Sequence, residues 1–174
     1  ILGYLAACER IIEREDGIVV TGATIDSLAM EDGGVIGGTI RDRDGTTVVR
    51  ARWTILATGG FQGSKDLVRE FISDKPEKIL LRSNPNSVGD GLRLGMSVGG
   101  THVDAMEGFY GHIIAYPLKK EFTPGDFLRL AQSIYSPFSL LLDKTGSRFT
   151  DESLGHYMNA QAVAKLPDAR ALIL

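Results

Sequence analysis

The chain has 174 residues, of which 43% are hydrophobic and 24% charged, so it can bury the core of one ordinary domain. Its 19 basic and 22 acidic residues give a net charge of −3 without any lysine- and arginine-rich run, which argues against nucleic-acid binding. The sequence has no apolar run of roughly 18 residues, no signal peptide and a single cysteine, so we expect a cytoplasmic protein without a transmembrane segment or an internal disulfide.

The first third of the chain predicts a helix followed by a β-meander. A partial apolar stripe indicates the helix over residues 1–14, with Gly17 as its C-terminal cap. Asp44-Gly45 is typical of a hairpin turn. The strands expected from apolar patterning are residues 18–20, 23–30, 35–41 and 48–57.

Two glycine-rich turns come next. Thr58-Gly59-Gly60 follows the last strand of the meander and precedes a helix over residues 65–72, capped by Ser64. Gly89-Asp90-Gly91 places Asp90 at the N-cap of a helix that reaches about residue 98. Because glycine has no Cβ, either turn could let a flat or anionic ligand approach the backbone, or could be an ordinary tight turn.

The last third predicts further short elements: a strand at 101–106, an irregular segment at 107–138, a hairpin within 139–150 and a helix at 156–165. None of the three histidines has a partner at metal-ligand spacing, so we expect no metal site. His112 lies in a glycine- and aromatic-rich loop, which is either a substrate wall or a packed loop. Arg148, close to Asp151 and Glu152, would ordinarily form a surface ion pair.

Three motifs, taken in order, resemble the fumarate reductase/succinate dehydrogenase flavoprotein family. They are Trp53-Thr54-Ile55-Leu56-Ala57-Thr58-Gly59-Gly60-Phe61, then Val88-Gly89-Asp90-Gly91, then Asp143-Lys144-Thr145-Gly146-Ser147-Arg148-Phe149 with Glu152. The resemblance implies a fold of the α+β or α/β class. Residues 1–104 would be part of a two-dinucleotide-binding-type FAD domain that includes the β-meander, and residues 105–174 the start of an α+β capping domain.

The resemblance also implies a site and a reaction. FAD would exchange a hydride with a C–C or C=C bond of a small carboxylate substrate, and Arg148 would donate or accept the proton. His112 and Glu152 would bind the substrate. The residues expected to contact FAD are Ala57, Thr58, Gly59, Gly60, Asp90 and Gly91.

Two departures from the family pattern shape this hypothesis. The family's proton-relay positions fall on Gln132 and Tyr135, which favours a dehydrogenase or an uncharacterised relative over a fumarate reductase. The segments Gly108-Phe109-Tyr110-Gly111-His112 and Tyr157-Met158-Asn159-Ala160 resemble the tricarballylate dehydrogenase-like members. The sequence also lacks a G-x-G-x-x-G motif, so we interpret the chain as an internal fragment that by itself binds FAD weakly or not at all and self-associates.

Two alternatives remain, and the electron partner stays open. The chain could be a cofactor-free structural or interaction module on the same scaffold. It could also belong to a ketosteroid dehydrogenase-like enzyme with an apolar substrate cavity lined by Phe109, Tyr110, Phe122, Phe127 and Phe138.

Overall fold

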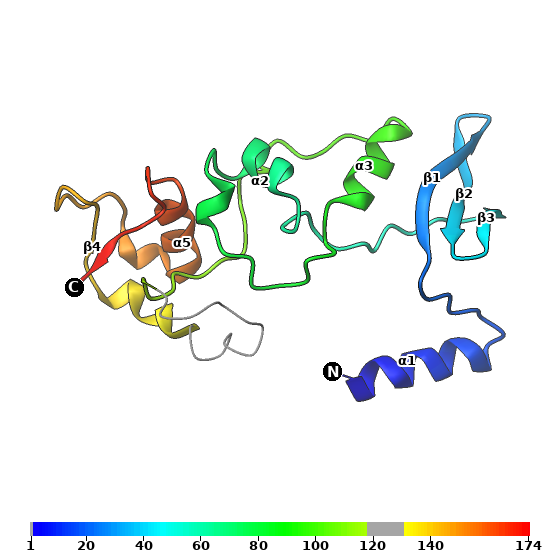
Figure 1. The fold of residues 1–174 in the computed structure, drawn as a ribbon, viewed down its shortest axis with the longest axis horizontal. Coiled ribbons are helices and arrows are strands. Elements are labelled where there is room, and N and C mark those ends of the chain that lie inside the picture. Colours follow the sequence, from blue (N-terminus) through cyan, green and yellow to red (C-terminus); the bar gives the residue numbers. More distant parts are fainter. Residues whose placement is uncertain (1, 118–130) are drawn as a thin grey trace. The chain divides into compact units, whose positions relative to one another are not determined.

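Helix α1, Leu2–Arg14, opens the chain and ends in a left-handed turn (Figure 1). The Gly17 N–H donates to the Ile12 carbonyl at 2.8 Å, and the Asp16 N–H donates to the Glu13 carbonyl at 3.1 Å. These two bonds form a Schellman motif. The residue in the left-handed region is Asp16, with φ 57°, and not Gly17, so the predicted cap is displaced by one residue.

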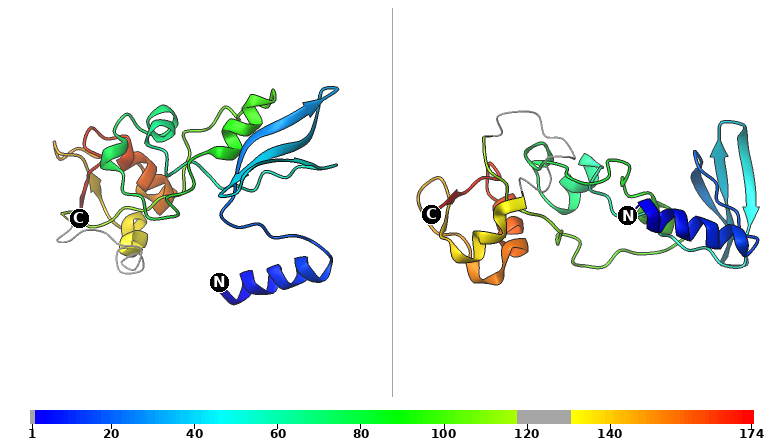
Figure 2. Two further views of the ribbon diagram at one scale, coloured as in Figure 1. Left: turned by 45° about the vertical axis from the view of Figure 1, so that its right-hand side comes forward. Right: turned by 90° about the horizontal axis from the view of Figure 1, so that it is seen from below.

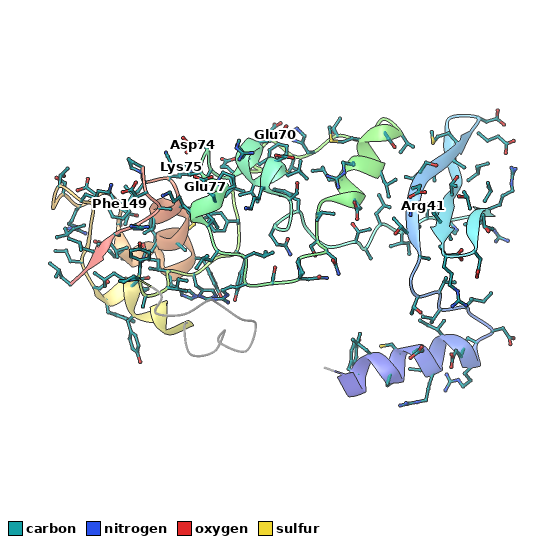
Figure 3. The ribbon with its side chains drawn as sticks, viewed as in Figure 1. Arg41, Glu70, Asp74, Lys75, Glu77 and Phe149 are labelled. Carbon is teal, nitrogen blue, oxygen red and sulfur yellow. The ribbon has the colours of Figure 1, made fainter. Side chains whose placement is uncertain are left out.

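An antiparallel three-stranded sheet follows, in the order β1-β2-β3, and Figure 2 shows its two hairpins. Its strands are β1 Thr24–Glu31, β2 Gly34–Asp42 and β3 Gly45–Arg50. The β1–β2 turn uses Asp32 and Gly33, both with positive φ, as a two-residue hairpin requires. Arg41 of β2, labelled in Figure 3, bridges to Asp26 of β1 through two hydrogen bonds of 2.8 and 3.0 Å.

The predicted meander is wrong at both ends. Residues 18–20 form no strand, and the strand expected to reach residue 57 ends at Arg50. Beyond it, one hydrogen bond continues the ladder, from the Ala51 N–H to the Ile36 carbonyl. Trp53 and Ile55 are 83% and 88% exposed. Their alternating pattern is that of a strand, but no described residue pairs with them, and a strand needs a partner for its backbone groups.

The chain divides into two compact units, Ile1–Leu56 and Ala57–Leu174, and the structure, a computed structural model, describes residues 2–117 and 131–174. The described helices of the second unit are α2 Lys65–Phe71, η1 Pro76–Lys78, α3 Asp90–Ser97, η3 Ala131–Phe138, η4 Glu152–Leu154 and α5 His156–Ala164. Strands β4 Leu141–Leu142 and β5 Leu172–Ile173 pair antiparallel.

The core of the second unit lies around β4 and α5. Leu141 is fully buried, and α5 contributes Ala160, Val163 and Ala164. Helix α5 packs against η3 and η4. The strand predicted at 101–106 does not form, and the predicted hairpin is reduced to a bridge between Leu142 and Arg148.

The architecture is therefore a mixture of helices with small antiparallel sheets, which agrees with the expected α+β class. The division into a domain at 1–104 and another at 105–174 stays a prediction. In the described parts of the chain, no helix combines the length and the apolar character that crossing a membrane requires.

Candidate cofactor and substrate sites

The two glycine-rich turns lie against each other, although about 30 residues separate them in the sequence. The Gly91 N–H donates to Oγ1 of Thr58 at 2.9 Å, and the Gly89 N–H donates to the Gly60 carbonyl at 3.2 Å. A third bond, 2.8 Å long, runs from the Gly63 N–H to the carbonyl of the buried Ser87. The structure therefore joins these two predicted motifs into one backbone surface.

Helix α3 starts at this surface and has no side-chain cap. Its N-cap is Gly89 in the left-handed region, with φ 86°, and Asp90 is the first helical residue. The prediction that Asp90 is the N-cap is therefore wrong. Its carboxylate pairs instead with Arg93 one turn later, at 3.0 Å. An acidic side chain in the first turn still interacts favourably with the helix dipole.

Close packing explains why glycine occupies these turns. A Cβ on Gly91 would lie 2.4 Å from Oγ1 of Thr58, and a Cβ on Gly89 would lie 2.4 Å from Cδ1 of Leu67. A Cβ on Gly60 would lie 2.6 Å from Oε1 of Gln62. Side chains at these positions would collide with these neighbours, so the close contact between the turns requires glycine.

The second group of site residues is the pair Arg148 and Glu152. Nη2 of Arg148 donates to Oε2 of Glu152 at 2.5 Å, and the Leu141 N–H donates to Oε1 at 2.7 Å. Glu152 is only 4% exposed, whereas the Arg148 side chain is 56% exposed. The hydrogen bond from Arg148, followed by that from Leu141, lowers the pKa of Glu152 to about 2. The same hydrogen bond to Glu152 raises the pKa of Arg148.

A polar turn before Arg148 and a buried amide after it hold this pair in place. Oδ1 of Asp143 accepts from the N–H groups of Thr145 and Ser147, at 2.8 and 3.0 Å. A hydrogen bond from the Thr145 hydroxyl, followed by these backbone bonds, lowers the pKa of Asp143. The Nδ2 group of the fully buried Asn159 donates to the Glu152 carbonyl at 3.0 Å. The exposed guanidinium of Arg148 is therefore held by the buried carboxylate of Glu152, which the Leu141 backbone keeps in place.

The third group surrounds His112. We name the residues Tyr110, His112, His156 and Tyr157 the aromatic cluster. The His112 ring stacks on His156 at a centroid distance of 5.2 Å and meets Tyr110 edge-on at 5.3 Å. The Tyr157 hydroxyl donates to the Tyr110 hydroxyl oxygen at 2.8 Å. Burial lowers the pKa of His112, and the nearby Arg82 and His156 lower it further.

Arg82 and His156 carry no motif in the sequence. Arg82 lies in a loop 30 residues before His112, so no periodicity or motif links the two. His156 follows the motif that contains Arg148, and only the start of α5 brings it to His112. The side chain of Gln132, and the whole of Phe122 and Phe127, lie outside the described residues. Tyr135 is exposed on η3. Within the described residues, no three His, Cys, Asp or Glu side chains gather as a metal site would require.

Comparison with known proteins shows to which family the chain belongs. Residues 5–170 match a protein family described as an FAD binding domain. The chain is 24% identical over 155 residues to the NADH:acrylate oxidoreductase of Vibrio harveyi, covering 86% of this chain and 15% of that protein. The chain thus spans less than a fifth of that relative's length.

Two solved structures share the fold. The 3-ketosteroid delta1-dehydrogenase of Sterolibacterium denitrificans, in complex with 1,4-androstadiene-3,17-dione, aligns with a TM-score of 0.64 and 16% identity, covering 88% of this chain and 27% of that one. The open conformation of a flavocytochrome c3 fumarate reductase aligns with a TM-score of 0.60 and 19% identity, covering 94% and 28%.

The residues present fit FAD, the cofactor of this family. The joined turns offer bare backbone beside the start of α3, where N–H groups and the helix dipole favour an anionic group. A Cβ on Gly91 or Gly60 would collide with Thr58 or Gln62, so the glycines allow the close contact between the two turns. The match over residues 5–170 and the joined turns lead to the same conclusion: the chain belongs to this family of FAD-binding domains.

Proposed function

We propose that the chain is part of an FAD-dependent oxidoreductase that transfers a hydride between the flavin and a C–C or C=C bond of a small carboxylate. The observation that carries this proposal is the exposed Arg148 guanidinium fixed on the buried carboxylate of Glu152. A guanidinium held in one orientation is suited to a carboxylate, because its fork of donors matches the two oxygens. The names of two relatives include acrylate and fumarate, which are unsaturated carboxylates.

FAD would be held at the surface formed by the two glycine-rich turns, by Ala57, Thr58, Gly59, Gly60, Asp90 and Gly91. When bound, the flavin supplies the hydride chemistry, and this chain's residues bind and orient the substrate. We assign residues 1–104 to the FAD-binding domain and residues 105–174 to the capping domain.

Arg148 would bind the substrate carboxylate and move a proton at the adjacent carbon. The hydrogen bond to Glu152 raises the pKa of Arg148, which makes it a more permanent cation and a poorer acid. We therefore propose that Arg148 acts mainly by binding the substrate carboxylate and less by transferring a proton. Both carboxylate oxygens of Glu152 accept hydrogen bonds within the chain, so in this proposal Glu152 positions Arg148 rather than contacting the substrate. His112 would bind the substrate from the capping side.

The test is Arg148→Lys in the whole flavoprotein, assayed with acrylate, fumarate and tricarballylate. Turnover should fall by roughly 10²- to 10⁴-fold, because lysine keeps the charge but loses the fork of donors. The visible flavin spectrum should not change, because the glycine-rich turns are intact. The matched control is Arg69→Lys, because Arg69 lies on the exposed side of α2 and pairs with Asp66. Wild-type turnover in the Arg148 variant would reject the proposal.

A second candidate is an enzyme for a bulky apolar substrate. Tyr110 and Phe138 expose most of their surface, at 72% and 89%, and could line such a cavity. A ketosteroid offered in the same assay separates the two candidates, since only the second expects turnover with a neutral ring system. The cofactor-free alternative predicts a whole protein that stays colourless with added FAD.

A further inference from the structure

We propose that Asn159 is a positioning residue of the reaction, which acts on Arg148 through the backbone of Glu152. This inference rests on the proposed function and deepens it, because it assigns the orientation of the substrate-binding guanidinium to a buried amide on α5. Asn159 itself has no exposed surface, so its effect on a substrate would have to pass through other residues.

The Asn159 side chain joins three elements of the second unit. Helix α5 packs against η3 and η4, and Figure 1 shows α5, in orange, beside the yellow helix η3. Nδ2 of Asn159 donates to Oγ of Ser136 on η3 at 3.1 Å and to the carbonyl of Glu152 on η4 at 3.0 Å. Ser136 and Glu152 are only 1% and 4% exposed. The amide therefore ties the backbone of Glu152 to two neighbouring helices inside the core.

The orientation of the amide favours the bond to Glu152 over complete pairing of Asn159. Oδ1 of Asn159 is buried and has no hydrogen-bond partner among the described residues, which costs free energy. Turning the amide over would bring Oδ1, an acceptor, to the Glu152 carbonyl, a second acceptor, and would break that bond. A residue needed only to fill this space could be leucine, which has nearly the same volume and no polar atom. The donor function of Asn159 is therefore the property that the site uses.

The backbone of Glu152 in turn decides where Arg148 is held. Helix η4 has three residues, so its own hydrogen bonds are too few to fix its place. The Glu152 carboxylate receives the Leu141 N–H at 2.7 Å and the Arg148 guanidinium at 2.5 Å. A surface arginine loses side-chain entropy when it is held in one geometry, and the Arg148 side chain is 56% exposed. Its orientation therefore depends on a carboxylate that Leu141 holds at the side chain and Asn159 holds at the backbone.

The experiment is a double-mutant cycle in the whole flavoprotein, with acrylate as the substrate. Asn159→Leu removes the donor at nearly constant volume, and the Gly155 N–H still donates to the Glu152 carbonyl at 3.2 Å. The KM for acrylate should rise by roughly 3- to 10-fold, the value of one ordinary hydrogen bond, and kcat should change less. In an Arg148→Lys background, Asn159→Leu should change the KM by less than about 2-fold, because the two residues act as one unit.

The matched control is Val163→Ala, since Val163 is also buried on α5 but lies outside this network. It should lower the melting temperature and leave the KM unchanged. Equal rises in KM for Asn159→Leu with Arg148 and with Lys at that position would overturn the positioning role and leave the proposed function standing. A rise of the same size in Val163→Ala would do the same, because it would trace the effect to lost stability.

A second variant keeps the test open if Asn159→Leu does not fold. Ser136→Ala removes the acceptor that holds the amide from η3, and it is one of the mildest changes to a buried residue. The KM for acrylate should rise with Arg148 in place and not in the Arg148→Lys background. An unchanged KM in a folded Ser136→Ala protein would reject the positioning role.

A wild type that turns over neither acrylate, fumarate nor tricarballylate would reject the proposed function, and the pH dependence of unfolding then tests the network by itself. In wild type, the urea midpoint should decline between the ordinary Glu152 pKa of 4.5 and its lowered value of about 2. Asn159→Leu should flatten this decline, because a Glu152 that is no longer held regains a more ordinary pKa. Val163→Ala should keep the wild-type slope. A wild-type slope in Asn159→Leu would show that Asn159 does not position Glu152.

Discussion

At the scale of single residues, Glu152 is the buried carboxylate whose pKa is lowered most clearly. It accepts hydrogen bonds from Arg148 and from the Leu141 backbone while almost fully buried. Its pKa falls from an ordinary 4.5 to about 2, so the ionised carboxylate stabilises the folded state. Because the pKa is lower in the folded state than in the unfolded state, Glu152 stabilises the fold at higher pH. The contribution is complete above about pH 4.5 and is lost as the pH falls towards 2.

We therefore predict that urea unfolding midpoints decline between pH 5 and 2, with Glu152 as a main contributor. Glu152→Gln should be less stable than wild type at pH 6 and should show a flatter decline. The control is Glu77→Gln, an exposed position on η1 labelled in Figure 3, which should keep the wild-type slope. If the unfolding midpoint of Glu152→Gln declines with pH as steeply as that of wild type, then Arg148 and Leu141 do not lower the pKa of Glu152.

A second residue-scale prediction concerns the cofactor surface. In Gly91→Ala the new Cβ would lie 2.4 Å from Oγ1 of Thr58, so the two turns must separate. We expect the FAD dissociation constant of the whole protein to rise at least 10-fold, measured by flavin fluorescence. Gly3→Ala on α1 is the control, because a Cβ there meets nothing within 4 Å. If Gly91→Ala and Gly3→Ala bind FAD equally well, the contact between the two turns does not contribute to FAD binding.

The residue-scale features differ in how visible they are in the sequence. Arg148 and Glu152 stand four residues apart in one motif, so their pairing could be expected from spacing. The burial of Glu152 could not, because it depends on the Leu141 backbone, 11 residues earlier. Arg82 gave no signal at all, because its neighbours come from segments 28 to 75 residues further along the chain. Long-range convergence of this kind leaves no local pattern.

At the scale of elements, β4 is short but central. Leu141 has no exposed surface, its strand pairs with β5, and its N–H reaches Glu152. Leu141→Ala should lower the free energy of unfolding by about 2–5 kcal/mol, the usual cost of a buried cavity. Leu154→Ala on η4 is the matched control, since Leu154 is 60% exposed and should change the value by less than about 0.5 kcal/mol. Equal losses, measured by urea unfolding, would mean that Leu141 is not a core residue.

Helices were easier to predict than strands in this chain. The helices expected at 1–14, 65–72 and 156–165 are confirmed within about a residue at each end. A helix satisfies its backbone groups within one segment, so local sequence decides it. The segments 18–20, 52–57 and 101–106 have strand-like sequences but form no strand among the described residues. Pairing is a property of the surroundings, and an apolar pattern cannot supply it.

At the scale of the whole molecule, the first unit exposes apolar side chains of its sheet, among them Ile25 and Val49. A hollow of ≈ 210 Å³ is lined there by Ile25, Leu28, Gly37, Gly38, Ile40, Val49, Ala51, Trp53, Thr54 and Ile55. Apart from Thr54, the lining is aliphatic, aromatic or glycine. An apolar surface of this kind, with Trp53 and Ile55 projecting from it, is typical of a contact with another part of a protein.

The expected self-association of the isolated 174-residue chain should therefore depend on this hollow. Light scattering should show a mass that rises with protein concentration, because pairing two such faces removes apolar area from water at about 25 cal/mol per Å². Trp53→Ser should weaken the association, since it removes the largest side chain of the lining. Tyr4→Ser should not, because Tyr4 is an exposed aromatic on α1 and is not among the residues that line the hollow. A chain that stays monomeric at all concentrations would contradict the role of the hollow. Equal weakening by both changes would indicate non-specific hydrophobic association.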